Sequence, residues 1–194
     1  MKKIAIIPGV GLFEDDLPDY SIFDIIKKEL PEFEIEWCNW QHNLEIPKID
    51  LSYPTFRKWV CEVLLDYQMV IKNGFDVDIP EADYYIGHSA GSILALLQRG
   101  PSIICGSPAC LVEDLQGVHA SECLMNSQPV FNIIHKRDLL AYPLDFHHVE
   151  NEIINTGWWK MSNWEPVHAH TCYFNDKKIC NMMIDKIKEW EKEL

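Results

Sequence analysis

The sequence is short of basic residues and has no long apolar run. It contains 17 Lys and Arg against 30 Asp and Glu, which gives a net charge of −13 at neutral pH. Nucleic acids and anionic membrane surfaces repel such a chain, so we expect neither as a partner. The longest apolar runs, such as residues 92–97, are far shorter than the roughly 20 residues that a membrane-spanning helix needs. We therefore predict no integral membrane association.

The cysteine patterns of disulfide-rich and redox proteins are also missing. The seven cysteines are odd in number and irregularly spaced, and no C-x-x-C pair occurs. This favours a reducing compartment without a disulfide framework. Residues 1–8 are basic and then apolar, as in a secretion signal, but the apolar part is too short and acidic residues follow at 14–16. We predict a cytoplasmic protein that forms a single domain over residues 1–194, because no repeat or linker divides it.

What the sequence does contain is the pattern Gly87-x-Ser89-x-Gly91, between two short apolar runs. This is the nucleophile-elbow pattern, a sharp turn between a strand and a helix that presents one serine. The turn needs small residues on both sides of the nucleophile, and Gly87, Ala90 and Gly91 meet that need. An ordinary Gly/Ser turn would have the same letters. The strand before it and the helix after it favour the catalytic interpretation, with Ser89 as nucleophile.

Hydrophobic periodicity predicts that strands and helices alternate along the chain. Strands are expected at 3–7, 33–37, 84–86, 102–105, 129–134 and 152–155, with a loop at 139–150 before the last one. Helices are expected at 21–30, 54–72, 92–97 and 175–193, and residues 111–126 are ambiguous. The strand at 33–37 alternates apolar and acidic residues, as strands near a sheet edge do. Alternation of this kind predicts the α/β class, a mostly parallel sheet flanked by helices on both faces.

A nucleophilic serine needs a base, and the base needs an acid that orients it. In this architecture the acid and then the histidine follow the serine along the chain. Asp138 lies just after the strand at 129–134 and is the predicted acid, with Asp145 as the fallback. His168 and His170 both lie before the last helix, and we choose His170 as the base because it is nearer to that helix. His88, inside the elbow, is interpreted as structural.

The oxyanion hole of such an enzyme needs two N–H donors. Ala90 directly follows the nucleophile and is the predicted first donor. The second is expected from the glycine-rich loop after the first strand, at Val10 or Gly11. This chemistry requires neither a metal nor a cofactor, so none is predicted, and the partner is a small-molecule ester substrate.

These residues resemble the α/β-hydrolase superfamily, in its small form without a large lid. The elbow matches the superfamily pattern, and Pro8-Gly9-Val10-Gly11 resembles its HGxG-type loop with proline in place of histidine. The second half resembles the class-three lipases, on residues 106–108, 132–143, 148–149 and 170–174. The resemblance implies a serine hydrolase that cleaves carboxylic esters through an acyl-enzyme. It also implies Asp138 as the acid and His170, over His168, as the base.

Two alternatives stay open. The chain could be a catalytically inactive hydrolase fold used for binding, with Trp158, Trp159 and Trp164 as exposed aromatic residues. It could instead bind a metal through its eight histidines, for which His147-His148 and His168-x-His170 are the candidates. No established spacing such as H-E-x-x-H supports the second alternative. The natural substrate, the preferred acyl chain and the oligomeric state do not follow from the sequence.

Overall fold

Six parallel strands form one sheet in the computed structural model, which describes residues 1–9, 21–40, 77–109, 128–155 and 169–193. The strands are β1 (Lys2–Ile7), β2 (Phe33–Trp37), β3 (Tyr84–His88), β4 (Ser102–Cys105), β5 (Val130–His135) and β6 (Val149–Ile154). Their order across the sheet is β2-β1-β3-β4-β5-β6, and every pairing is parallel. The predicted α/β class is confirmed. The carboxyl ends of all six strands lie at one edge of the sheet, where functional residues of α/β proteins gather.

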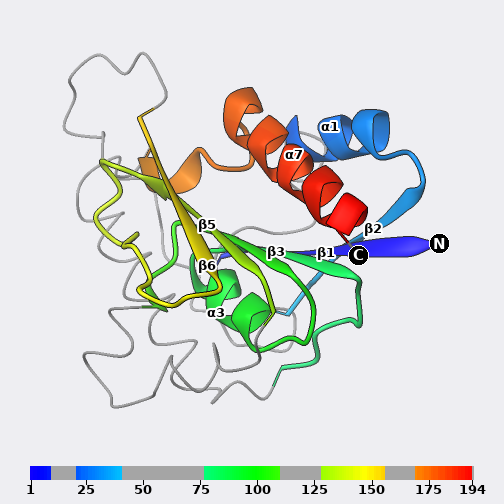
Figure 1. Ribbon diagram of the computed structural model, residues 1–194, viewed down its shortest axis with the longest axis horizontal. Coiled ribbons are helices and arrows are strands. Elements are labelled where there is room, and N and C mark those ends of the chain that lie inside the picture. Colours follow the sequence, from blue (N-terminus) through cyan, green and yellow to red (C-terminus); the bar gives the residue numbers. More distant parts are fainter. Residues whose placement is uncertain (10–20, 41–76, 110–127, 156–168, 194) are drawn as a thin grey trace, which may run out of the picture.

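Helices cover both faces of this sheet. Figure 1 shows α1 (Ser21–Glu29) and α7 (Lys177–Glu193) on one face, and α3 (Ala90–Leu96) on the other. Successive side chains of β1 point to opposite faces of the sheet. Ile4 and Ile6 pack in the core under α1 and α7, whereas Ala5 and Ile7 pack in the core on the α3 side. Because the central strands are buried on both faces, their sequences are mostly apolar.

The edges of the sheet differ from its centre. The strand at 33–37 is β2 and lies at one edge, as its alternation predicts. The other edge is β6, whose residues 150–153 are exposed. The strand predicted at 152–155 is β6, but it begins three residues earlier, at Val149, so the last two residues of the loop predicted at 139–150 belong to the strand. Its mixed polar sequence shows no clear period, and the strand is specified by hydrogen bonding to β5 along its whole length.

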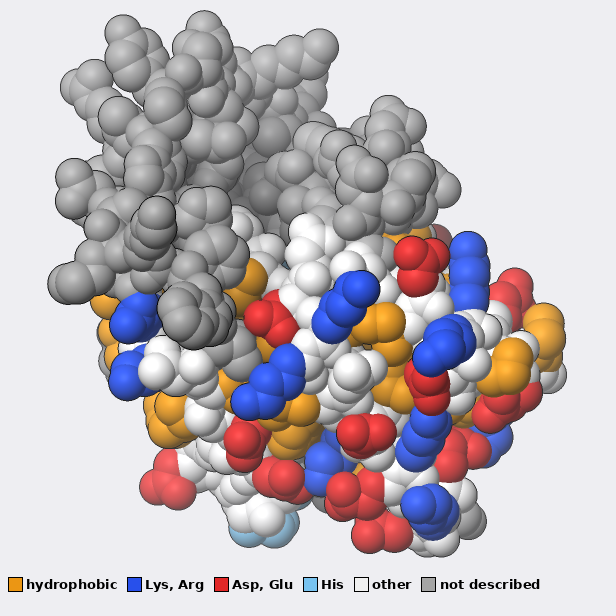
Figure 2. Space-filling view, turned by 90° about the horizontal axis from the view of Figure 1, so that it is seen from above, with side chains coloured by type: hydrophobic (Ala, Val, Ile, Leu, Met, Phe, Trp, Pro, Cys, Tyr) orange, Lys and Arg blue, Asp and Glu red, His pale blue; other side chains and the backbone are white. Residues whose placement is uncertain are grey.

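The last helix begins two residues later than predicted. Asp176 precedes α7, and its Oδ1 accepts hydrogen bonds from the backbone N–H groups of Lys178, at 2.8 Å, and Ile179, at 3.3 Å. Asp176 is therefore the N-cap, a position that aspartate favours because it satisfies N–H groups without a partner inside the helix. Figure 2 shows the face above α1 and α7, where acidic and basic side chains intermingle. One ion pair on this face joins the two helices, between Lys188 and Glu29 at 3.0 Å.

Several predictions fall on residues outside the described part of the chain. Among these are the helix at 54–72, the ambiguous segment 111–126, and the three tryptophans of the binding alternative, Trp158, Trp159 and Trp164. The absence of a large lid and the single domain likewise stay predictions. Among the described residues, no helix has both the length and the apolar character needed to cross a membrane.

Candidate active site

Ser89 occupies the sharp turn between β3 and α3. It is the only non-glycine residue with a positive φ in the described part of the chain, at φ 52° and ψ −124°. A side chain in that region of backbone space is strained, and such strain is concentrated at functional sites. The turn is possible because of its glycines. A Cβ at Gly87 would lie 2.6 Å from the Gly91 carbonyl oxygen, and a Cβ at Gly91 would lie 2.2 Å from the Ile7 carbonyl oxygen.

The hydroxyl groups of Ser92 and Ser107 stabilise the turn through hydrogen bonds. Ser92 Oγ hydrogen-bonds to the carbonyl oxygen of Ser89, and Ser107 Oγ lies 2.7 Å from Ser92 Oγ. Ser92 has one hydroxyl hydrogen, which it donates to the carbonyl, so Ser107 donates to Ser92. Both serines are buried. The first turn of α3 and the loop after β4 are thus tied to the backbone of Ser89.

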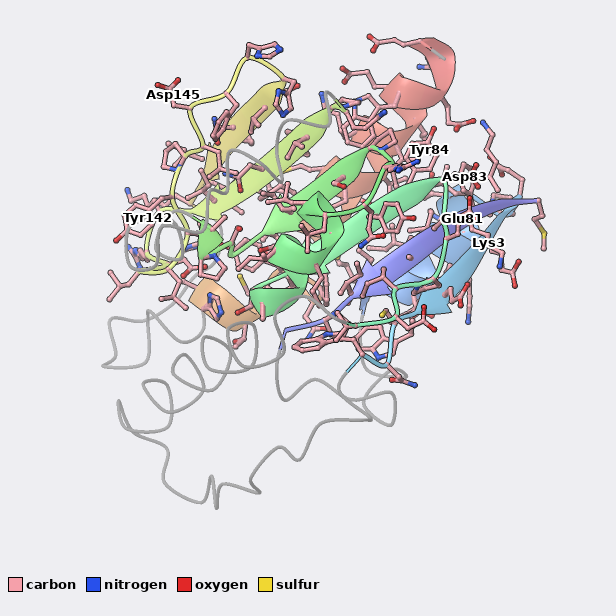
Figure 3. All side chains as sticks on the ribbon, turned by 90° about the horizontal axis from the view of Figure 1, so that it is seen from below. Lys3, Glu81, Asp83, Tyr84, Tyr142 and Asp145 are labelled. Carbon is pink, nitrogen blue, oxygen red and sulfur yellow. The ribbon has the colours of Figure 1, made fainter. Side chains whose placement is uncertain are left out.

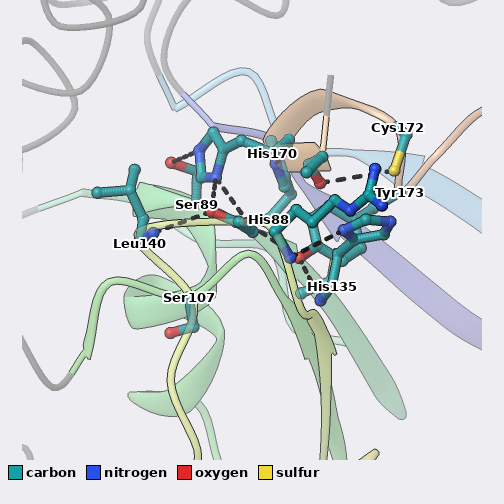
Figure 4. Close-up of polar contacts among 12 residues, drawn as sticks. His88, Ser89, Ser107, His135, Leu140, His170, Cys172 and Tyr173 are labelled. Carbon is teal, nitrogen blue, oxygen red and sulfur yellow. Dashed lines mark hydrogen bonds and ion pairs between the residues drawn. The ribbon is translucent and has the colours of Figure 1, made fainter. Parts of the chain in front are cut away.

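The three residues predicted as a triad form a continuous hydrogen-bonded chain (Figure 4). His170 Nε2 lies 3.0 Å from Ser89 Oγ, and His170 Nδ1 lies 3.0 and 3.1 Å from the two carboxylate oxygens of Asp138. An ionised carboxylate only accepts hydrogen bonds, so Nδ1 carries the hydrogen and Nε2 has a free electron pair for the serine hydroxyl. This is the tautomer that a general base facing Ser89 requires.

The Asp138 carboxylate is buried and held by three donors. Besides His170 Nδ1, the Tyr173 hydroxyl donates to Oδ2 at 2.8 Å, and the Leu140 backbone N–H donates to Oδ1 at 3.0 Å. Burial raises the pKa of this carboxyl, but the charge of His170 and these hydrogen bonds outweigh it, so the pKa lies below its usual value of 3.8. Asp138 is therefore ionised at neutral pH, and hydrogen bonds to both of its carboxylate oxygens fix its orientation.

Each member of the chain comes from a loop at the carboxyl edge of the sheet. Asp138 follows β5 in a turn closed by a hydrogen bond from its own N–H to the His135 carbonyl at 2.8 Å. His170 lies in a helical turn at 169–171, a few residues before α7. Asp145, the fallback acid, is exposed on the loop between β5 and β6 (Figure 3). The structure thus brings Ser89, Asp138 and His170 together and leaves Asp145 apart from them.

The structure describes the first predicted oxyanion donor, Ala90, but not the second. Ala90 is the first residue of α3, so its N–H has no partner inside the helix. Val10 and Gly11 lie outside the described residues, as does His168. The residue before them, Gly9, passes close to the nucleophile, because a Cβ built on Gly9 would lie 2.8 Å from Ser89 Cβ. The loop after β1 thus reaches Ser89 at the point where the predicted second donors begin.

The site is enclosed. Ser89 has no exposed surface, and Asp138 and His170 are 5% and 6% exposed. Enclosure strengthens each hydrogen bond of the chain, since water does not compete for it.

No metal centre is found among the residues that the structure places. No group of three or more His, Cys, Asp or Glu in that part of the chain is arranged to hold an ion. The Nδ1 of His170 is engaged by Asp138, and His147 is exposed beside His148, with their ring centroids 5.0 Å apart. The two ring nitrogens of His170 face the Asp138 carboxylate and the Ser89 hydroxyl group.

Two residues of the site were missed by sequence reasoning. Tyr173 was noted only as part of a resemblance, and His88 was interpreted as merely structural. Both form hydrogen bonds with residues of the predicted triad: Tyr173 with Asp138, and His88 with the His170 carbonyl. A buried tyrosine hydroxyl needs a partner, which is the signal that points to Tyr173. Nothing local in the sequence identifies that partner, since it is 35 residues away.

Comparisons with known proteins add a distant fold likeness. No known family model matches the chain, and no curated protein matches it. Among solved structures, the chain is similar to the crystal structure of the putative cell surface hydrolase from Lactobacillus plantarum WCFS1, at 11% sequence identity and a TM-score of 0.44. The match covers 100% of this chain and 92% of that one.

Proposed function

We propose that this protein is a serine hydrolase that cleaves carboxylic esters through Ser89, His170 and Asp138. The observation that carries the proposal is the continuous hydrogen-bonded chain from Ser89 Oγ through both ring nitrogens of His170 to a buried, ionised carboxylate. The strained backbone of Ser89 supports it, because an ordinary turn serine has no need of a positive φ. The ester as substrate class and the acyl-enzyme belong to the proposal and follow from the resemblance of the motifs.

The reaction proceeds in two halves. Ser89 Oγ attacks the ester carbonyl carbon while His170 Nε2 takes the hydroxyl proton, and the carbonyl oxygen becomes an oxyanion near the Ala90 N–H. The tetrahedral intermediate collapses, the C–O bond to the alcohol breaks, and His170 gives its proton to the departing alcohol. Water then attacks the acyl-enzyme with His170 as base, which releases the carboxylic acid and restores Ser89. Asp138 stabilises the protonated His170 in both halves.

A second candidate is an inactive hydrolase fold that serves as a binding protein. The observation that favours it is the complete burial of Ser89, since a buried nucleophile meets no substrate unless the protein opens. The two candidates differ in one measurable property. An active site opens and reacts with an electrophile, whereas an inactive one does not.

Hydrolysis of short p-nitrophenyl esters tests the proposal. We expect Ser89→Ala to lower kcat by several orders of magnitude, because removing the nucleophile of a triad costs about 10⁶-fold in a well-studied case. Asp145→Asn is the matched control, since this aspartate is exposed and apart from the triad, and it should keep wild-type activity. Circular dichroism verifies that each variant is folded. Equal activity in Ser89→Ala and wild type would rule out Ser89 as the nucleophile.

A further inference from the structure

His88 precedes the nucleophile and contacts the residue predicted to be the base. It is the last residue of β3 and is 4% exposed. Its Nε2 lies 2.6 Å from the main-chain carbonyl oxygen of His170 (Figure 4). A carbonyl oxygen only accepts, so Nε2 carries a hydrogen and donates it. The residue before the serine therefore fixes the backbone of the residue whose side chain faces the serine.

The ring of His88 is also packed into the segment that carries His170. Ring centroids lie 5.0 Å from His170, 5.6 Å from Tyr173 and 5.5 Å from Phe174. Burial, followed by the like charge of His170, lowers the pKa of His88 to about 3, so this ring is neutral at neutral pH. A neutral imidazole adds no positive charge beside the imidazolium that forms on His170 during catalysis. It provides a hydrogen bond without opposing the protonation of its neighbour.

We infer that His88 is a positioning residue, which holds the main chain of His170 so that Nε2 of His170 stays in line with Ser89 Oγ. The inference rests on the proposed function and deepens it. Two anchors then define the place of His170: Asp138 holds its ring, and His88 holds its backbone. A catalytic group that shifts by about 1 Å can lose about 100-fold in rate, so the backbone anchor affects kcat although His88 touches no substrate.

Two substitutions of His88, by glutamine and by asparagine, separate the effect of the hydrogen bond on activity from the effects of polarity and packing. In His88→Gln, the side-chain amide nitrogen takes the place of Nε2 and can donate to the His170 carbonyl. In His88→Asn, the amide lies at the level of Nδ1, a buried atom that has no hydrogen-bond partner among the described residues. Both variants are neutral and polar, and only the glutamine keeps the anchor.

We expect His88→Asn to lower kcat on a p-nitrophenyl ester by about 10- to 100-fold with KM nearly unchanged, and His88→Gln to recover most of this loss. The same order should hold for the rate of labelling by a fluorophosphonate probe. Activities are measured well below the thermal midpoint of each variant, so that a difference in stability does not enter.

The outcomes are distinct. Equal rates in wild type, His88→Asn and His88→Gln overturn the inference while the proposed function stands. Equal losses in both variants also overturn it, because they indicate that the imidazole ring acts through its shape and not through the Nε2 hydrogen bond. If the probe does not label even the wild type, the proposed function fails first, and the positioning role fails with it.

Discussion

At the scale of single residues, Tyr173 joins two parts of the site through one hydroxyl group. The hydroxyl donates to Asp138 Oδ2 at 2.8 Å and accepts a hydrogen bond from the His135 backbone N–H at 3.0 Å. It therefore connects the end of β5 to the carboxylate that follows it. Burial, followed by the negative charge of Asp138, raises the pKa of this phenol well above its usual value, so it is a donor at neutral pH.

Tyr173→Phe removes this hydroxyl and should affect stability more than activity. The variant loses the buried hydrogen bond between the His135 N–H and this hydroxyl, which costs about 1–3 kcal/mol of unfolding free energy. Asp138 keeps its bonds from His170 and Leu140, so kcat should fall by only about 10-fold or less. Urea denaturation and ester hydrolysis measure the two effects. Tyr142→Phe is the control, because the Tyr142 side chain is exposed, and it should change neither quantity.

The candidate triad was accessible to sequence reasoning because its members follow strands. Ser89 is marked by its glycines, and Asp138 and His170 lie where the chain order of this architecture places an acid and a base. The supporting bonds of His88 and Tyr173 were not accessible, since each joins residues at least 35 positions apart in the chain. Contacts of this kind depend on how loops meet at the sheet edge, which no local pattern specifies.

At the scale of elements, α7 is anchored to the sheet by one apolar stripe. Met183 and Ile187 on this stripe are fully buried in the core that α7 shares with α1 and the strands. The helix was predicted at 175–193 from hydrophobic periodicity, because a period of 3.6 residues is typical of a half-buried helix. The start of β6 was missed by three residues, because its mixed sequence shows no clear period.

Ile187→Ala tests the packing of α7. Truncating a fully buried isoleucine should lower the free energy of unfolding by about 2–5 kcal/mol, because a cavity replaces lost contacts. Asp185→Ala lies on the exposed side of the same helix and should change it by no more than about 0.5 kcal/mol. Urea denaturation of both variants provides the comparison. Equal losses would contradict the orientation of α7.

At the scale of the whole molecule, buried His88 makes stability depend on pH. In the unfolded chain His88 binds a proton below about pH 6.5, whereas in the folded protein it does so only near pH 3. Between these values the unfolded state binds more protons, so the free energy of unfolding falls as the pH is lowered, by up to about 1.4 kcal/mol per pH unit. The stabilisation is complete above pH 6.5 and is lost on acidification.

His88→Gln removes this titration and leaves His170 and Asp138 in place. Its free energy of unfolding should therefore fall less than that of the wild type between about pH 7 and pH 5. Urea denaturation at several pH values gives the two slopes. Parallel slopes would mean that His88 titrates alike in the folded and unfolded states, contrary to its burial.

The fold class could be predicted from the sequence, but the order of the strands in the sheet could not. Alternating strands and helices imply a parallel sheet with two helical layers, and the sheet has that form. The strand order was not predicted, because it depends on which apolar faces pack together over long distances. The oxyanion donors at Val10 and Gly11 stay predictions, supported by the approach of Gly9 to Ser89.

The most direct test of the central claim is the covalent labelling of Ser89. Intact wild-type protein is treated with a fluorophosphonate probe, digested, and analysed by mass spectrometry to find the modified residue. The proposed function predicts one phosphonylated serine, at position 89, and no labelling in His170→Ala or after denaturation of the wild type. An unlabelled Ser89 in folded wild-type protein would contradict it and favour the inactive binding protein.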